Sequence, residues 1–385
     1  MPKKRILIIS PEVVFPADTG GKIRTATLAK QLSMFSKVTI LYVANGNINT
    51  FEANIDQERV PLGKYFNLWS LVSLWNPLSP KLPTKVISNI CKIRDRVNPD
   101  VVLFEHSTTT SLINSIGWGD AELVYSTHNV DSDTHAEKLR LLPYQWFPGN
   151  VWRRVLMNIR ARKQDMLAVT SSDQLWVCSE HDRKRYQELA DVAATLVPNP
   201  VPNETVFGFT INPERYTHGG IIYIGTLTYK PNLMAIDVLV NEVLPLLPNY
   251  ADLQIAGRHG AHLAKEVGKH ANLKLILDLP EISKVLEPAG FSILPINSGG
   301  GTRIKVLEAM AAGVVLIATA KAVEGLGLVP DKHFVQAETA DAMALAYSEL
   351  SNNPEVAKKV AIEARAFVFK RFGADTIGNI LRDLV

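Results

Sequence analysis

Short uninterrupted apolar runs, each followed by a glycine-containing loop and a helical pattern, constrain the fold of this chain most strongly. The first run is Ile6 to Ile9, its loop contains Gly20 and Gly21, and residues 22–35 have apolar side chains at helical spacing. A second run covers residues 38–43. Strands that are apolar on both faces are typical of parallel sheets covered by helices on both sides. The opening of the chain therefore predicts a βαβ unit.

The same order of elements returns after a proline-rich segment. Residues 197–203 read Val-Pro-Asn-Pro-Val-Pro-Asn and mark a junction between two domains. Beyond them, residues 219–225 predict a strand, and residues 232–246 predict a helix. The fold class is therefore α/β, with two Rossmann-like, doubly wound domains and a cleft between them, because ligands bind outside the carboxyl ends of parallel strands. We expect domains at 1–209 and 210–370, and a C-terminal helix at 371–385 that packs back on the first domain.

Composition and charge limit the partners. The 385 residues are 46% hydrophobic and carry a net charge of +3, which indicates a globular protein and does not favour nucleic acid. The apolar run near the N-terminus is too short for a signal peptide, so we expect a cytoplasmic protein. Two aromatic stretches, 66–75 and 142–152, predict core packing or a lid. Their alternative is a peripheral contact with the inner membrane face, or a groove for a lipid-linked acceptor.

The stretch from Asn297 to Gly313 is the most informative segment. It reads Asn-Ser-Gly-Gly-Gly-Thr-Arg-Ile-Lys-Val-Leu-Glu-Ala-Met-Ala-Ala-Gly. Thr302 can cap a helix that ends at Gly313, where glycine readily adopts a left-handed conformation. Arg303 and Lys305 then fall in the first turn, where the helix end already carries partial positive charge and each added cation is unfavourable.

A bound phosphate would reverse this electrostatic cost. The backbone N–H groups of Gly299, Gly300 and Gly301, the helix end and the two cations all favour an anion. Glu308 lies three residues after Lys305 on the same helix face, so its carboxylate can accept hydrogen bonds from a ribose. We expect a nucleotide-diphosphate site, and the alternative is a solvated, charged helix start.

Other polar side chains stand at the ends of predicted strands. Their place is the expected ligand-binding edge of a parallel sheet. The candidates are Glu105 and His106 after the strand 99–104, His128 after the strand 123–127, and Arg258 after the strand 253–257. A histidine at such a place is also often an ordinary hydrogen-bonded surface group.

Taken together, these features resemble glycosyltransferase family 4, the retaining, glycogen-synthase-like "glycosyl transferases group 1" enzymes of the GT-B fold. Residues 298–313 resemble the donor site of the branch that reads Gly-Gly-Gly-Thr-Arg-x-Lys-x-x-Glu. With the first glycine loop, His128, the Val-Pro-Asn segment and Gly-Thr-Leu at 225–227, the resemblance covers nearly the whole chain. Many members carry two glutamates seven residues apart. Here the second matches Glu308, and Gly300 occupies the place of the first.

The resemblance implies roles for individual residues. Arg303 and Lys305 hold the diphosphate and stabilise its charge as it leaves, Glu308 binds the ribose, and His128 lies against the transferred sugar. Backbone amides of the glycine run contact the sugar in place of a side chain at Gly300.

The remaining matches are less direct. Gly20, Gly21 and Gly225 allow the backbone to approach the donor closely, and Arg258 reaches the nucleotide or its phosphates. Lys230 is one residue out of register with a lysine of the family.

The implied activity is metal-independent transfer of a hexosyl group, with retention of configuration, from a UDP- or GDP-linked sugar to a glycan or lipid-linked acceptor. Such a reaction belongs to polysaccharide or glycoconjugate biosynthesis and needs no cofactor. Two alternatives stay open. One is a GT-B-fold nucleotide-sugar epimerase or a phosphorylase. The other is a non-catalytic nucleotide-binding subunit, because the first glutamate is missing.

Overall fold

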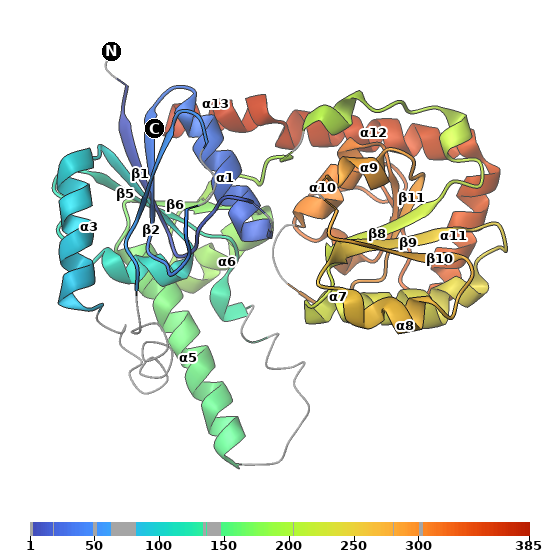
Figure 1. Ribbon diagram of the computed structural model, residues 1–385, viewed down its shortest axis with the longest axis horizontal. Coiled ribbons are helices and arrows are strands. Elements are labelled where there is room, and N and C mark those ends of the chain that lie inside the picture. Colours follow the sequence, from blue (N-terminus) through green and yellow to red (C-terminus); the bar gives the residue numbers. More distant parts are fainter. Residues whose placement is uncertain are drawn as a thin grey trace. The chain divides into compact units, whose positions relative to one another are not determined.

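The computed structural model describes residues 3–17, 19–48, 52–62, 82–133, 136, 148–202, 204–279, 281–299 and 303–385. The chain forms two compact units, one made of Met1–Pro200 and Ile377–Val385, the other of Val201–Thr376. Each unit is built on a parallel β-sheet with helices packed on it (Figure 1). This confirms the predicted α/β class and its two Rossmann-like domains.

The N-terminal unit contains a seven-stranded sheet in the order β3-β2-β1-β4-β5-β6-β7. Its strands are β1 (Arg5–Ser10), β2 (Lys37–Tyr42), β3 (Ile55–Arg59), β4 (Val101–Glu105), β5 (Glu122–Ser126), β6 (Gln174–Val177) and β7 (Thr195–Leu196). Its helices are α1 (Gly20–Ser33), α3 (Thr84–Val97), the 3₁₀ helix η1 (Ser107–Leu112), α5 (Pro148–Thr170), α6 (Glu180–Ala190) and α13 (Ala374–Leu384).

Alternation along β1 explains how this sheet buries both faces. Ile6 and Ile8 belong to a core cluster with residues of α1 and α13, whereas Leu7 and Ile9 belong to a second cluster with residues of α3. Successive side chains of a strand point to opposite faces, so an apolar run of four serves two helical layers at once. The run seen in the sequence is therefore the central strand of a three-layer unit.

The C-terminal unit contains a six-stranded sheet in the order β10-β9-β8-β11-β12-β13. Its strands are β8 (Ile221–Thr226), β9 (Leu253–Arg258), β10 (Leu273–Leu277), β11 (Phe291–Leu294), β12 (Val315–Ala318) and β13 (Val335–Gln336). Its helices are α7 (Lys230–Val238), α8 (Ala264–Val267), α9 (Ser283–Leu286), α10 (Ile304–Ala311), α11 (Ala340–Asn352) and α12 (Pro354–Phe372), with short 3₁₀ helices η2 (Glu204–Gly208), η3 (Pro213–Arg215), η6 (Ala261–Leu263) and η7 (Ala320–Val323).

The helix predicted over 232–246 is shorter and less regular than expected. After α7 the chain passes through a π-helical turn, η4 (Leu239–Val243), and then a 3₁₀ turn, η5 (Leu244–Leu246). Pro245 has no N–H to continue an α-helical hydrogen-bond ladder, which accounts for the change of helix type.

The division between the units falls after Pro200, earlier than the boundary expected after residue 209. Val201 and Val206 already pack in the core of the C-terminal unit, and the N–H of Val201 donates to the carbonyl of Phe372. Because Phe372 lies in the same core, the chain leaves this unit only after Thr376. The expected C-terminal segment corresponds to α13, which packs in the core of the N-terminal unit.

In both units the strand order reverses beside the first strand. The reversal lies between β1 and β4 in one sheet and between β8 and β11 in the other. Loops leaving the carboxyl ends of such neighbouring strands run in opposite directions and leave room for a ligand. The functional residues should therefore be sought at these two places.

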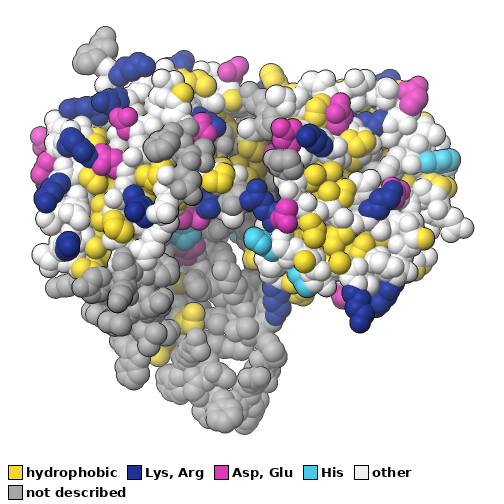
Figure 2. Space-filling view, viewed as in Figure 1, with side chains coloured by type: hydrophobic (Ala, Val, Ile, Leu, Met, Phe, Trp, Pro, Cys, Tyr) yellow, Lys and Arg dark blue, Asp and Glu magenta, His cyan; other side chains and the backbone are white. Residues whose placement is uncertain are grey.

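The described surface gives no strong partner signal. Lys and Arg side chains are interspersed with Asp and Glu over the face shown in Figure 2, in keeping with the small net charge. No helix within the described ranges combines the length and the apolar character needed to cross a bilayer. The two aromatic stretches singled out from the sequence lie largely outside the described residues.

Candidate active site

The loop between β11 and α10 is shaped by Arg303. This residue is the N-cap of α10, and its guanidinium donates to four backbone carbonyls at 2.6–3.3 Å. Those carbonyls belong to Ser298, Gly299, Lys321 and Ala322. The cation predicted for phosphate binding therefore also ties the glycine loop to the segment after β12.

The start of α10 corrects one expectation. Thr302 was expected to cap the helix, but the helix begins at Ile304 with Arg303 as its N-cap and without a side-chain cap. Extended backbone at Arg303 lets its side chain turn back on the loop, so the helix begins one residue later. Gly300, Gly301 and Thr302 themselves lie outside the described residues. The predicted end is right, because Gly313 has φ +81° directly after the last turn.

Lys305 is held by a neutral side chain. Its Nζ donates to Oδ1 of Asn232 at 2.9 Å and lies 4.9 Å from the ring centroid of Tyr223. Burial, together with the nearby charge of Arg303, lowers the pKa of Lys305 to about 7. No carboxylate within the described ranges pairs with it. The ammonium therefore stands in a polar but uncompensated setting that suits an anion.

Glu308 follows on the same helix and is 7% exposed. Burial raises the pKa of its carboxyl to about 7. No side-chain hydrogen bond or ion pair to Glu308 forms within the part of the chain that the structure describes. Since a buried polar group without a partner is costly, this carboxylate has an unused capacity to accept hydrogen bonds.

Gly225, at the end of β8, is fixed by its neighbours. A Cβ there would lie 2.8 Å from Nδ2 of Asn232 and 3.1 Å from Nζ of Lys305. Only glycine leaves room for both groups. The structure thus brings together Gly225, Lys305 and the loop at Gly299, at the reversal between β8 and β11.

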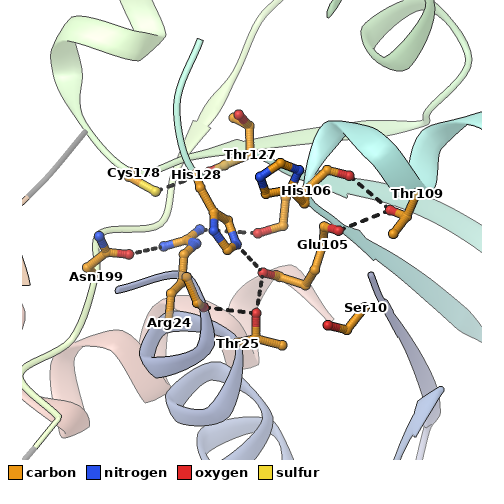
Figure 3. Close-up of polar contacts among 12 residues, drawn as sticks. Ser10, Arg24, Thr25, Glu105, His106, Thr109, Thr127, His128, Cys178 and Asn199 are labelled. Atoms are coloured by element: carbon orange, nitrogen blue, oxygen red, sulfur yellow. Dashed lines mark hydrogen bonds and ion pairs between the residues drawn. The ribbon is translucent and has the colours of Figure 1, made fainter. Parts of the chain in front are cut away.

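In the N-terminal unit, Glu105 and His128 form a hydrogen-bonded pair (Figure 3). Nε2 of His128 lies 2.6 Å from Oε2 of Glu105, which also accepts from the hydroxyl of Thr25 at 2.9 Å. Burial alone would raise the pKa of Glu105. The hydrogen bond from His128, the charge of His128 and that of Arg24 outweigh burial and lower this pKa to about 2. With 1% of its side chain exposed, Glu105 contacts His128 but is closed off from solvent.

The first glycine loop meets this pair. A Cβ on Gly21 would lie 3.2 Å from Nδ1 of His128, whereas one on Gly20 would meet nothing within 4 Å. Gly21 therefore brings the start of α1 against Nδ1 of His128. Arg24, which is next to the loop in sequence, is buried and donates to Val197, Asn199 and Ser126. It joins α1 to the Val-Pro-Asn segment instead of facing a ligand.

Three other predicted residues lie at the ends of strands or helices. His106 has φ +73°, and its ring packs edge-on against that of His128 with centroids 5.6 Å apart. Arg258 is the last residue of β9, paired in register with Thr226, and is exposed. Lys230 is the first residue of α7 and is also exposed.

Asp131 and Asp133 are two residues apart in the sequence, a spacing that suits two ligands of a divalent ion. The carboxylate of Asp133, however, pairs with Arg185 at 2.7 Å, and that of Asp131 accepts a hydrogen bond from Ser107. Over the described ranges no group of three or more His, Cys, Asp or Glu side chains is arranged to hold a metal ion.

Sequence reasoning missed two residues of the C-terminal site. Asn232 contacts Lys305 across 73 positions, and Tyr223 packs beneath the ammonium from β8. For Asn232, a local pattern pointed to a buried polar contact, because it is a polar residue on the buried side of the helix that follows Gly225.

Part of the chain matches a known family, and the whole chain has a distant curated relative. Residues 218–353 match the family described as "Glycosyl transferases group 1". A curated relative from Klebsiella pneumoniae, an "uncharacterized 44.6 kDa protein in cps region", is 20% identical over 97% of both chains.

Solved structures show the same fold over the whole chain. Sucrose-phosphate synthase from Thermosynechococcus elongatus is 15% identical, with a TM-score of 0.75 over 99% of this chain and 98% of that one. HepE from Anabaena, in complex with UDP, is 13% identical, with a TM-score of 0.70 over 99% of each chain. The chain therefore has the GT-B fold.

Proposed function

We propose that the protein is a retaining glycosyltransferase that moves a hexosyl group from a UDP- or GDP-linked sugar to a glycan or lipid-linked acceptor. The observation that carries the proposal is a pair of groups on α10, of which Lys305 lies beside Gly225. Among the described residues, the ammonium of Lys305 has no carboxylate partner and the buried carboxylate of Glu308 has no side-chain partner, and the two stand one helical turn apart. Diphosphate and ribose are the two parts of a nucleotide that such groups would bind.

Known relatives support this choice of ligand. HepE from Anabaena was crystallised with UDP, with UDP and glucose, and with UDP-glucose. We carry over to this chain a nucleotide-sugar donor in the C-terminal unit, and we place the acceptor in the N-terminal unit.

In this proposal the cations act on the leaving group. Negative charge develops on the diphosphate as the glycosidic bond to the donor breaks. Lys305 and Arg303 are held by hydrogen bonds before the reaction, so they would stabilise that charge without reorganising and without a metal ion. Glu308 accepts hydrogen bonds from the ribose hydroxyls and fixes the nucleotide.

The N-terminal unit would contribute His128. Its Nε2 is occupied by Glu105, so Nδ1 is the nitrogen that remains for the transferred sugar. Because Glu105 stays ionised, it fixes both the orientation of the ring and the position of its proton on Nε2.

A binding measurement tests the donor site first. Calorimetric titration with UDP and with GDP should give binding of one of them by the wild type, and at least tenfold weaker binding by Glu308→Ala, because a charge-assisted hydrogen bond contributes about 1.5–3 kcal/mol. Glu349→Ala, an exposed carboxylate on α11, is the matched control and should bind as the wild type does. Binding of neither nucleotide, or equal binding by Glu308→Ala, would refute the site.

A donor panel tests the reaction. Nucleotide released from UDP- and GDP-sugars is detected by mass spectrometry, with and without added glycan acceptors. Release should persist in the presence of EDTA and should fall by at least a hundredfold in Lys305→Met, since loss of one preorganised charge contact costs about 3 kcal/mol or more in the transition state. The anomeric configuration of the product, read by NMR, decides between retention and inversion.

A further inference from the structure

Asn232 occupies an unusual place for an amide side chain. It is 7% exposed, and its three hydrogen bonds leave one orientation of the amide. Nδ2 donates to the carbonyl of Thr226 at 3.0 Å, which turns Oδ1 toward the hydroxyl of Tyr223 at 3.1 Å and Nζ of Lys305 at 2.9 Å. The opposite orientation would set an NH₂ group against an ammonium.

The acceptor for Lys305, the amide oxygen of Asn232, is neutral, and this affects anion binding. A carboxylate in the same place would form a buried ion pair with Lys305 and would neutralise the field that an anion needs. Among the described residues, the charge of Arg303 acts on Lys305, the ring of Tyr223 on β8 contacts it, and Glu308 lies one helical turn further along α10. Asn232 directs the ammonium over Gly225 while leaving its charge unmatched.

We propose that Asn232 is a positioning residue for the anion site. Its amide oxygen fixes the amine of Lys305 and adds no negative charge beside it, so that Lys305 takes up a proton only when a nucleotide diphosphate binds. The inference rests on the proposed function, because it assigns the diphosphate to this site.

The protonation of Lys305 follows from its surroundings. In the free protein, burial and the charge of Arg303 lower the pKa of Lys305 to about 7, so that at pH 7.5 the amine is mostly neutral. A diphosphate beside it favours the ammonium. Binding at pH 7.5 should therefore draw in about half a proton or more at this residue.

Calorimetry measures this uptake directly. UDP and GDP are titrated at pH 7.5 in PIPES and in Tris, two buffers with different ionisation enthalpies, and the difference in observed heat gives the number of protons bound. Protons exchanged by the nucleotide or by Glu308 are common to all variants. The informative quantity is therefore the difference between the wild type and each variant.

Three variants separate positioning from simple support of the fold. Asn232→Asp should pair with Lys305, weaken nucleotide binding at least tenfold and abolish the extra proton uptake, because Lys305 is then charged before binding. Asn232→Ala should also weaken binding, but it should keep the uptake. Lys305→Arg is always charged and should lose the uptake. Asn241→Asp, an exposed change of equal charge, is the control and should match the wild type.

The outcomes distinguish the two proposals. If the wild type binds neither UDP nor GDP, the nucleotide site and the role of Asn232 both fail. If the wild type binds but Asn232→Asp shows unchanged affinity and unchanged proton uptake, only the role of Asn232 is overturned. Melting temperatures identify any variant that does not fold. If Asn232→Asp is such a variant, equal proton uptake by the wild type and Lys305→Arg overturns the inference.

Discussion

Glu308→Gln should make the folded protein more stable at alkaline pH. The glutamine keeps the size and the hydrogen-bonding capacity of the side chain but cannot ionise. In the wild type, burial raises the pKa of the Glu308 carboxyl from an ordinary 4.5 to about 7. Between these values the unfolded chain loses its proton first, so ionisation favours unfolding.

The size of the effect follows from the shift. Each pKa unit corresponds to about 1.4 kcal/mol, so the destabilisation grows from near zero below pH 4 to about 3 kcal/mol above pH 8. Removing the carboxylate should recover this amount, as an upper limit. For a unit of this size, the gain corresponds to roughly 2–4 °C in melting temperature per kcal/mol.

Melting temperatures of wild type and Glu308→Gln, recorded by calorimetry from pH 4.5 to pH 8.5, test this reasoning. The difference between them should be small at the acid end and should widen steadily with pH. Glu349→Gln, a change to an exposed carboxylate on α11, should give a difference that hardly depends on pH. A Glu308→Gln difference that stays constant over this range would refute the account, because it would mean that the carboxylate is already compensated in the folded state.

Three further changes probe the groups around both sites. Glu105→Gln should destabilise the protein by up to about 3 kcal/mol at pH 7, measured by urea denaturation. The loss should shrink as pH falls from 4.5 toward 2, because the ionised carboxyl is what stabilises the folded state and it becomes protonated over this range. Gly21→Ala should displace the His128 ring and change its NMR resonances, whereas Gly20→Ala, with no neighbour within 4 Å, should leave them in place. Gly225→Ala should weaken UDP binding about tenfold or more with little change in fold, since its Cβ would push Asn232 away from Lys305; unchanged affinity would show that this contact is dispensable.

The parts of the fold that sequence predicted well depend on local patterns. The runs at Ile6 to Ile9 and at Val101 to Phe104 are visible because burial on both faces leaves a continuous apolar signature. Lys305 and Glu308 could be identified because helical spacing alone places them on one face. The positive φ at Gly313 was predictable for the same local reason.

The parts that were missed depend on contacts between distant segments. Arg303 was expected to bind phosphate, but its four carbonyl partners come from two segments whose approach no local pattern encodes. Glu105 was expected at the ligand-binding edge of the sheet, yet it is buried, and Thr25 of α1 and His128 after β5 bind its carboxylate. The domain boundary was misplaced because proline marks a turn and cannot show which core the following valines enter.

The return of the chain to the N-terminal unit has a consequence for biosynthesis. Ile377 and Leu381 of α13 are fully buried in the same core cluster as β1 and α1. The ribosome synthesises the whole C-terminal unit after β1 and α1 and before α13. We therefore expect the N-terminal sheet to stay incompletely covered until α13 has left the exit tunnel. The C-terminal unit is one continuous segment and can fold during synthesis.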